Sequence, residues 1–458
     1  MKKSGLILFF YFVCNLHLYG QKIITVAGNG SGGYHGDGGL ATLTTIGFFG
    51  GLAVDKHGNI YIADGNNYRI RKVDTAGIIT TIAGTGINGF TPDGAKSDTS
   101  KIGYDGAVEV DTSGNIYFAD AGRIRKIDAI THIISTYVGT GTPGYSGDGH
   151  HADSAGVNIG EFIFDRFNNL YLMDGPNYRI RKIDASGIIS TVAGTGVLGY
   201  SGDGGSALSA SLNSDFALGI CTDDTGNVYF PDGNLTVRKY NVLTGIITRV
   251  AGKGDTVSLY SGEGGSAMLA HFDVQAVAVD DTGNIYIDDD GNNRIEKVDL
   301  HGTIRTIVGN GVAGYSGDGS LADSAKINNP ENIIIDKCNN LYIADFANRR
   351  VRKVIFDSTC GKSIGDTNTH VVVNNIVANN DFEIYPNPAR SSLQLTVGNW
   401  RSNKKNNYLI KDIMGRNMLE GNIASFRQLI DISGLIEGIY FVEVNNNGQR
   451  VIKKFVKE

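Results

Sequence analysis

Short apolar runs recur along most of the chain and are separated by turn-forming residues. In a clear example, the runs cover residues 51–54, 60–63, 69–73 and 78–83. Their length and their β-branched and aromatic side chains predict strands. The intervening segments 55–59 and 74–77 contain the Asp, Gly and Asn residues that are typical of hairpin turns. The pattern therefore predicts a unit of four antiparallel strands.

This unit repeats. Six segments share the pattern Asp-x-x-(Gly/Asn)-Asn-apolar-Tyr-apolar-x-Asp, and they span residues 55–64, 111–120, 165–174, 223–232, 280–289 and 336–345. The Asn of the pattern stands at 59, 115, 169, 227, 284 and 340, so successive copies lie 54 to 58 residues apart. Four antiparallel strands repeated radially describe the blades of a β-propeller. A solenoid is the alternative, but its unit usually carries a helix or a single strand.

The chain ends favour a closed ring. A fourth-strand pattern, (Thr/Ser/Arg)-x-x-Gly-x-Gly, ends the first five copies but is missing after the sixth, whereas an isolated copy covers residues 23–30. We therefore expect the N-terminal segment to supply the last strand of the last blade, which removes a free sheet edge. The predicted fold is an all-β, six-bladed propeller over residues 21–357.

The first residues have the features of an export signal. Met1-Lys2-Lys3 is followed by an apolar run at residues 6–13, which is far shorter than the ~20 residues of a membrane-spanning helix. A signal peptide over residues 1–20, cleaved between Gly20 and Gln21, is expected. The mature chain would keep Cys221, Cys338 and Cys360, and of these Cys338 and Cys360 are the favoured pair.

The repeat stops before the C-terminus. Residues 358–381 are rich in Ser, Thr, Asn, Gly and Asp, which indicates a linker. From residue 382 onward, apolar runs cover 393–397, 408–413, 428–432, 440–444 and 451–456. Gly and Asn turns separate them, so residues 382–458 are predicted to form a small β-sandwich.

Composition narrows the class of protein. The 458 residues include 63 Gly, about twice the ~7% of an average protein, but only 7 Pro. Collagen is excluded because no G-X-Y period is present. Disorder is unfavoured because 41% of residues are hydrophobic and the net charge is only −6. The glycines belong to the recurring turns.

Within the repeats, Asn67-Tyr68-Arg69-Ile70-Arg71-Lys72 and residues 177–182, 292–294 and 348–350 resemble NHL repeats, which build six-bladed propellers. The second copy is shortened, and the fourth has Thr236 where an Arg is expected. A Gly-Tyr-Ser-Gly-Asp-Gly segment, complete at 144–149, 199–204 and 314–319, is similar to loops of bacterial NHL proteins and of the NHL domain of teneurins.

The tail has a resemblance of its own. Tyr385-Pro386-Asn387-Pro388 and residues 412–416, 432–435 and 438–441 resemble the type A C-terminal sorting domain of the type IX secretion system. The resemblance implies a Gram-negative bacterium of the Bacteroidetes group and contact with that secretion machinery. It also implies passage through the periplasm, and then release or attachment at the outer cell surface. An ordinary adhesive β-domain is the alternative.

Acidic residues recur where binding loops are expected. In a propeller of this kind, the long fourth-to-first-strand links and the second-to-third-strand links share one face, and such loops commonly carry function. The acids of the long loops are Asp37, Asp93, Asp148, Asp203, Glu263 and Asp318. Those that end second strands are Asp64, Asp120, Asp174, Asp232, Asp289 and Asp345. A binding role predicts an acidic face. A structural role predicts ion pairs, such as Asp64 with Arg69 and Asp174 with Arg179.

A second set of acids does not follow the repeat. Asp105, Glu161, Asp215, Asp273 and Glu331 stand near the starts of first strands, which line the central channel. Carboxylates that converge on the axis would suit Ca²⁺, which takes six to eight oxygen ligands. The alternative is a solvated channel mouth.

Enzymatic chemistry has weaker support. NHL propellers include amidating lyases with a zinc–histidine site, and related propellers include calcium lactonases. The mature chain's histidines fall mostly in loops and none in first-strand runs, so no zinc triad is predicted, and no catalytic residue is assigned. No nucleophile elbow or phosphate loop is present. An acidic face on an exported chain also disfavours nucleic acid.

The expected function is binding of extracellular protein, glycan or matrix through the long-loop face. The alternative is a Ca- or Zn-dependent hydrolase or lyase with its site in the channel.

Overall fold

The structure of the chain is a computed structural model. It describes residues 21–47, 50–103, 106–213, 218–233, 235–255 and 257–356. In the tail it describes residues 382–385, 392–397, 407–412, 416–423, 425, 427–436, 438–446 and 449–457. The chain divides into two compact units, Met1–Lys362 and Ser363–Glu458. The predicted signal peptide and linker lie outside the described residues. Within these residues, no helix has the length and apolar character needed to cross a membrane.

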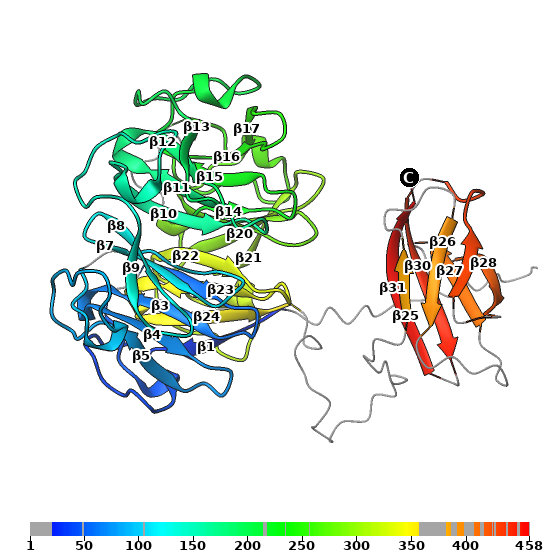
Figure 1. Cartoon of the computed structure of the whole chain (residues 1–458), viewed down its shortest axis with the longest axis horizontal. Coiled ribbons are helices and arrows are strands. Elements are labelled where there is room, and N and C mark those ends of the chain that lie inside the picture. Colours follow the sequence, from blue (N-terminus) through cyan, green and yellow to red (C-terminus); the bar gives the residue numbers. More distant parts are fainter. Residues whose placement is uncertain are drawn as a thin grey trace, which may run out of the picture. The chain divides into compact units, whose positions relative to one another are not determined.

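The described part of the first unit forms six four-stranded antiparallel sheets, as the repeat predicted (Figure 1). Blade one contains β2 (Leu52–Val54), β3 (Ile60–Asp64), β4 (Arg69–Val73) and β5 (Ile79–Ala83). Blade two contains β6 (Val108–Val110), β7 (Ile116–Asp120), β8 (Arg123–Ile127) and β9 (Ile134–Val138). Blade three contains β10 (Ile159–Phe164), β11 (Leu170–Asp174), β12 (Arg179–Ile183) and β13 (Ile189–Ala193).

The remaining blades have the same order from the axis outward. Blade four contains β14 (Cys221–Thr222), β15 (Val228–Asp232), β16 (Thr236–Tyr240) and β17 (Ile247–Ala251). Blade five contains β18 (Val274–Val279), β19 (Ile285–Asp289), β20 (Arg294–Val298) and β21 (Ile304–Val308). Blade six contains β22 (Pro330–Ile335), β23 (Leu341–Asp345), β24 (Arg350–Ile355) and the N-terminal strand β1 (Lys22–Ala27).

Strand β1 closes the ring, as predicted. It pairs antiparallel with β24, from Lys22 opposite Ile355 to Ala27 opposite Val351. Figure 1 shows the blue N-terminal strand beside the yellow strands of the last blade. Because opposite ends of the propeller sequence share one sheet, the ring cannot open without breaking this ladder.

The hydrophobic core lies between the blades. Six clusters of buried side chains each draw residues from two neighbouring blades, and one of them joins blade six to blade one. That cluster packs Ile60 and Ile62 against Tyr342 and Ala344. On the other face of the same strand, Tyr61 and Ala63 pack toward blade two. Alternate residues of one strand therefore serve different blade interfaces, which accounts for second strands that are buried throughout.

The Asp of the repeated motif stabilises the first hairpin of each blade. Asp55 Oδ1 accepts hydrogen bonds from the backbone N–H groups of His57 and Asn59, both at 2.9 Å. Asp55 Oδ2 accepts from Asn59 Nδ2 at 2.6 Å and from the Tyr61 hydroxyl at 3.1 Å. In blade one the Asp, Asn and Tyr of the motif thus form one hydrogen-bonded turn.

Single 3₁₀ turns complete the propeller. Four of them follow second strands, and in each the next residue has left-handed backbone geometry: η2 (Gly65–Asn67), η5 (Gly175–Asn177), η8 (Asp290–Asn292) and η10 (Phe346–Asn348). The others lie in the long links: η1 (Ala41–Leu43), η3 (Ser97–Thr99), η4 (Ala152–Ser154), η6 (Ala207–Ser209), η7 (Ala267–Leu269) and η9 (Ala322–Ser324).

The second unit contains two sheets. One joins β25 (Phe382–Tyr385), β26 (Ser392–Val397) and β29 (Arg427–Asp431). The other has the order β28 (Asn417–Asn422), β27 (Asn407–Asp412), β30 (Gly438–Asn446) and β31 (Gln449–Lys457). Leu393, Ile410, Ile430 and Val442 are among its buried core residues. The five predicted strands are present, and β25 and β28 are additional. The polar sequence of β28, Asn-Met-Leu-Glu-Gly-Asn, explains why hydrophobicity did not predict it.

Candidate binding face and charged sites

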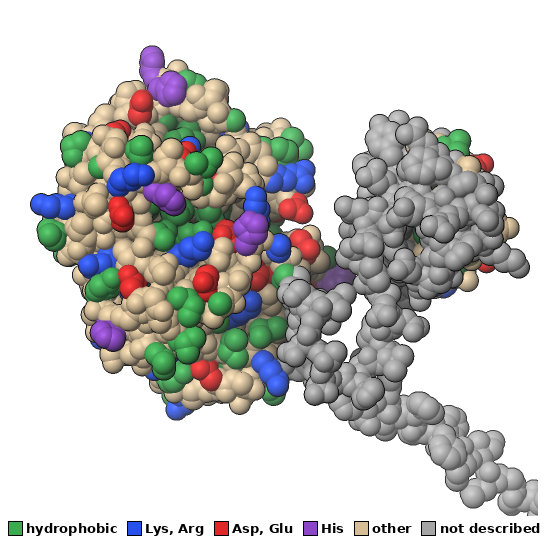
Figure 2. All heavy atoms as spheres, turned by 60° about the horizontal axis from the view of Figure 1, so that its bottom comes forward, with side chains coloured by type: hydrophobic (Ala, Val, Ile, Leu, Met, Phe, Trp, Pro, Cys, Tyr) green, Lys and Arg blue, Asp and Glu red, His purple; other side chains and the backbone are tan. Residues whose placement is uncertain are grey.

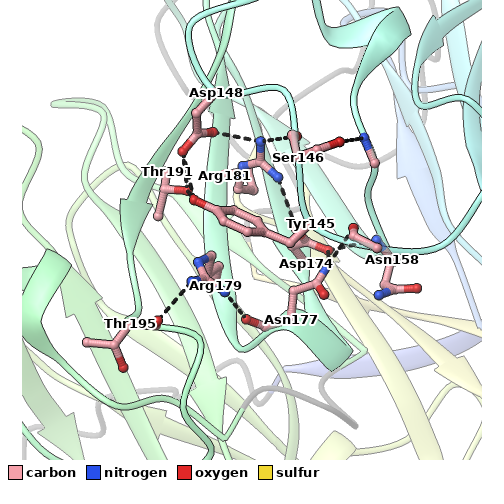
Figure 3. A network of polar contacts seen from close by, with 12 residues as sticks. Tyr145, Ser146, Asp148, Asn158, Asp174, Asn177, Arg179, Arg181, Thr191 and Thr195 are labelled. Carbon is pink, nitrogen blue, oxygen red and sulfur yellow. Dashed lines mark hydrogen bonds and ion pairs between the residues drawn. The ribbon is translucent and has the colours of Figure 1, made fainter.

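An arginine in the third strand of blade three lies between two aspartates (Figure 3). The Arg181 side chain is fully buried, and its Nη1 lies 3.2 Å from Asp174 Oδ2. Its Nη2 lies 2.6 Å from Oδ1 of the loop residue Asp148. Asp174 Oδ1 accepts hydrogen bonds from the Asn158 backbone N–H and from Asn177 Nδ2. The buried Arg181 and Asp174 are therefore paired with each other, as burial requires.

Four other blades repeat this group. Each buried arginine contacts the aspartate that ends the second strand and the aspartate of the long loop, at 2.6 to 3.3 Å. The groups are Asp37–Arg71–Asp64, Asp93–Arg125–Asp120, Asp203–Arg238–Asp232 and Asp318–Arg352–Asp345. In five blades the loop acid is therefore an ion-pair partner within its own blade.

Both predicted ion pairs, Asp64 with Arg69 and Asp174 with Arg179, are wrong. Asp64 lies opposite Arg69 in the strand ladder, but its ion-pair partner is Arg71. The Arg69 guanidinium instead donates to the carbonyls of Asn67 and Thr85 and lies over the Tyr34 ring. Asp174 likewise pairs with Arg181 rather than with Arg179, whose guanidinium donates to the carbonyls of Asn177 and Thr195. Carbonyl groups at the strand ends thus hold the first arginine away from the acid.

The long loops cover the outer edge of each blade. In blade one, the N–H of Gly38 donates to the Ile79 carbonyl, and the N–H of Ile79 donates to Gly39. The N–H of Thr81 donates to Asp37 Oδ2 at 3.1 Å. Burial raises the pKa of Asp37, but bonds from Thr81, Tyr34 and Arg71 outweigh it and lower the pKa below its usual value. These loops protect the edges of the outermost strands.

The face where the long loops begin carries a ring of aromatic side chains, one for each blade. An arginine guanidinium lies 3.6 to 4.8 Å from each ring centre. Four of the rings remain 41 to 44% exposed: Tyr34, Phe90, Tyr145 and Tyr315. The other two are Tyr200 and Tyr260. Exposed aliphatic residues stand beside them in the same links, among them Ile87, Val197, Leu198 and Val312. On the side of the propeller seen in Figure 2, acidic and basic side chains are scattered among such hydrophobic ones.

Blade five breaks the charge pattern. Glu296 in β20 stands where the other blades have the buried arginine, and the loop acid there is Glu263. Glu296 is fully buried, and its Oε1 lies 3.1 Å from Thr306 Oγ1. Neither Glu296 Oε2 nor Asp289 Oδ2 has a hydrogen-bond partner. Burial, together with nearby Asp289, raises the pKa of Glu296 to about 8.

Further acids gather between blades five and six. Asp288 is fully buried, and neither of its carboxylate oxygens has a hydrogen-bond partner. Burial raises its pKa well above the usual value, and Asp290, Asp289 and Glu331 add to the shift. Burial also raises the pKa of Asp290 to about 6 and that of Glu331 to about 7. At the position of Asp288 the other blades have apolar residues: Ala63, Ala119, Met173, Pro231 and Ala344.

The predicted channel acids are only partly assembled. Asp273 raises the pKa of Asp290, and Asp290 raises the pKa of Glu331, so both predicted acids belong to the group between blades five and six. Glu161 belongs to another group, because the carboxyl that raises its pKa beyond the effect of burial is Glu109. Asp105 and Asp215 lie outside the described residues. As the described side chains stand, no three His, Cys, Asp or Glu residues form a ready metal-binding set.

The first strands of several blades line a mostly apolar cavity. A cavity of about 150 Å³ is lined by Glu109, Ile163, Cys221, Ile334 and neighbouring residues. Burial raises the pKa of Glu109 to about 8. Cys221 is a free thiol, whereas Cys338 is in a disulfide. Cys360, its predicted partner, lies outside the described residues.

Comparison of the repeats would have revealed Glu296. At the position of Arg71, Arg125, Arg181, Arg238 and Arg352, the fifth copy alone has an acid. Asp288 and Asp290 carry the same kind of signal, since the other copies have no acid at either position. Comparison of the repeats does not predict that Glu109 lies near Glu161, because their proximity depends on how the blades are arranged.

Known families match both parts of the chain. Residues 383–458 match the secretion system C-terminal sorting domain, and residues 29–92 match the teneurin NHL domain. Chicken Teneurin-1 is 28% identical over 264 residues, which is 50% of this chain. The Arabidopsis thaliana protein SUPPRESSOR OF QUENCHING 1 is 27% identical over 334 residues, or 69% of this chain. The chain spans only 9% and 31% of these relatives' own lengths.

Solved structures share the fold. A protein of unknown function from Bacteroides thetaiotaomicron aligns with a TM-score of 0.53 at 18% identity, covering 73% of this chain and 76% of that one. An auxiliary nutrient binding protein from the same organism aligns at 0.51 and 18%, covering 73% and 77%. At this identity the likeness shows the fold alone. The sorting domain, in turn, directs export by type IX secretion to the cell surface or beyond. The chain is an NHL-repeat β-propeller that carries a type IX secretion C-terminal sorting domain.

Proposed function

We propose that the exported protein is a binding module and that its long-loop face contacts an extracellular protein or glycan. The observation that carries this proposal is the ring of six aromatic side chains, which repeats in every blade on one face. Four of its members keep 41 to 44% of their surface exposed. Aromatic rings supply large contact areas with little loss of conformational freedom, and apolar patches on a soluble protein commonly mark interaction sites.

The loop acids have a different role in this proposal. Asp37, Asp93, Asp148, Asp203 and Asp318 each pair with a buried arginine of their own blade. A ligand that drew one of them away would leave that arginine with an unmatched charge. We therefore assign recognition to the aromatic and aliphatic side chains, and framework support to the acids.

The experiment uses the mature protein and a screen of glycans and purified extracellular proteins. Two variants alter the face: Val197→Asp with Leu198→Asp, and Val312→Asp alone. These side chains are 52 to 62% exposed. The matched controls are Leu243→Asp and Leu300→Asp, which lie in the third-to-fourth-strand links on the opposite face. Both control side chains are at least 68% exposed, so neither control disturbs packing.

We expect the screen to yield a ligand whose affinity falls at least about tenfold in the face variants and stays unchanged in the controls, because a charge is placed in an apolar contact. Absence of any ligand would contradict the proposal. So would a ligand that the control variants weaken and the face variants do not.

A further inference from the structure

We propose that blade five binds a Ca²⁺ ion between Glu263, Asp289 and Glu296, at the place where the other blades hold an arginine guanidinium. This site goes beyond the proposed binding function and does not depend on it. It also differs from the predicted channel site, because neither Glu331 nor Asp273 is one of its three carboxylates.

The other blades define the geometry of the site. In each, a guanidinium lies 3.0 to 3.3 Å from the aspartate that ends the second strand. The same guanidinium lies 2.6 to 2.9 Å from the acid of the long loop. The fold therefore places two carboxylates around a positive charge five times. In blade five the two carboxylates, Asp289 and Glu263, are still present, but the carboxylate of Glu296 stands in place of the arginine.

The oxygens that would face the ion have no partner. Glu296 Oε2 and Asp289 Oδ2 are both buried and accept no hydrogen bond. In the other blades, the oxygen equivalent to Asp289 Oδ2 is the one that contacts the guanidinium. An unpaired buried carboxylate is costly, and a hard cation with a preference for oxygen ligands removes that cost.

The charge deficit equals the charge of a divalent ion. Blades one, two, three and six each combine two arginines with two aspartates at these positions, and the charges cancel. Blade four has one arginine and two aspartates, a sum of −1. Blade five has one arginine, Arg294, and three acids, a sum of −2.

Nearby positive groups do not fill this deficit. The Arg294 guanidinium donates to Thr306 Oγ1 at 3.3 Å and to the Asn310 carbonyl at 3.4 Å. It acts on Asp289 and Glu296 from a distance but forms no ion pair with either at the distances seen in the other blades, and Arg305 acts on the exposed Glu263.

The loop acid provides access to the site. Glu263 is exposed, whereas Asp289 and Glu296 are fully buried. Glu263 Oε2 accepts hydrogen bonds from the Thr306 N–H at 3.0 Å and from Thr306 Oγ1 at 2.9 Å. The three carboxylates do not yet surround one point, so binding requires Glu263 to exchange the Thr306 hydroxyl for the ion. The longer side chain of Glu, relative to the Asp of the other blades, gives it that reach.

The test measures Ca²⁺ binding by the full mature protein, with CaCl₂ alone as the probe. Calorimetry at pH 7.5 should show one ion bound. A saturating concentration should raise Tm by about 3 °C or more over EDTA, since a ligand that binds only the folded state stabilises it. Glu296→Arg, which restores the arginine of the other blades, should have a higher Tm in EDTA and no response to Ca²⁺. Glu296→Gln should also lose the response.

Glu331→Gln is the matched control, because it removes an acid of blade six near the channel and leaves the three proposed ligands in place. Its response to Ca²⁺ should equal that of the unaltered protein. Three outcomes overturn the proposal: no binding by the unaltered protein, a response that persists in both Glu296 variants, or a response lost in Glu331→Gln. The last outcome would place the ion at the channel mouth.

Discussion

Asp148 lies 2.6 Å from Arg181, although 33 residues separate them along the chain. The contact ties the long loop that precedes blade three to the third strand of that blade. Because Arg181 is fully buried and also holds Asp174, the loop, the second strand and the third strand share one electrostatic group. The same arrangement in four more blades makes the loop acids part of the framework.

Loss of the buried guanidinium should therefore be costly. Arg181→Met leaves Asp174 buried without its counter-charge, and we expect a loss of about 3 to 5 kcal/mol in the free energy of unfolding. Arg179→Met is the control, because that partly exposed guanidinium donates to carbonyls and lies over the Tyr145 ring, and it pairs with no acid. Its cost should be about 1 kcal/mol. Urea unfolding of both variants measures the difference, and equal costs would contradict the structural role of Arg181.

The buried Glu296 of blade five should make the protein less stable as the pH rises. The pKa of Glu296 is raised to about 8, so the folded state holds a proton that the unfolded chain releases at a lower pH. In EDTA, this group should make the protein less stable as the pH rises from about 4.5 to 8. Tm measured across that range should fall, and Glu296→Gln should flatten the decline. A Tm profile identical in the two proteins would contradict the assignment.

Gly194, which follows the last strand of blade three, and Gly204, in the long loop before blade four, allow the cost of backbone strain to be measured apart from the cost of a steric clash. Gly194 and Gly204 both have positive φ angles, of +93° and +80°. A Cβ at Gly194 would lie 2.2 Å from the Tyr178 carbonyl oxygen, whereas a Cβ at Gly204 meets nothing within 4 Å. Gly204→Ala should cost about 1 to 2 kcal/mol from the left-handed backbone alone. Gly194→Ala should cost clearly more, as measured by Tm, and equal effects would contradict a steric role.

Closure of the ring gives a prediction for the N-terminal strand. Ile23 is fully buried in the core between blades five and six. Ile23→Ala should cost about 2 to 5 kcal/mol, a value typical of a core truncation. The neighbouring Lys22→Ala, at an exposed position, should cost little. Thermal unfolding of the two variants tests the role of β1, and a small effect at Ile23 would show that closure contributes little to stability.

The number of blades, the strands of each blade and the closing strand could all be predicted from the sequence. These features follow from local rules, because strands and turns have periods and residue preferences that repeat visibly in every copy. Strand positions agree closely: the predicted run 69–73 is β4 (Arg69–Val73), and 78–83 became β5 (Ile79–Ala83). Sequence motifs also identified the sorting domain, since they stand in order through the whole tail.

The pairing of the charged side chains, in contrast, depends on the folded arrangement of the blades. Each loop acid could face solvent or the blade, and nothing in its neighbouring residues distinguishes the two. The choice depends on a partner about 34 residues away, such as Arg71 for Asp37, which the fold alone brings within 2.6 Å. The same reason explains why Arg69 was expected as the partner of Asp64. Which residues lie opposite each other in a strand ladder can be predicted from sequence. The partners of a long side chain depend instead on its burial and on the groups that the folded blade places around it.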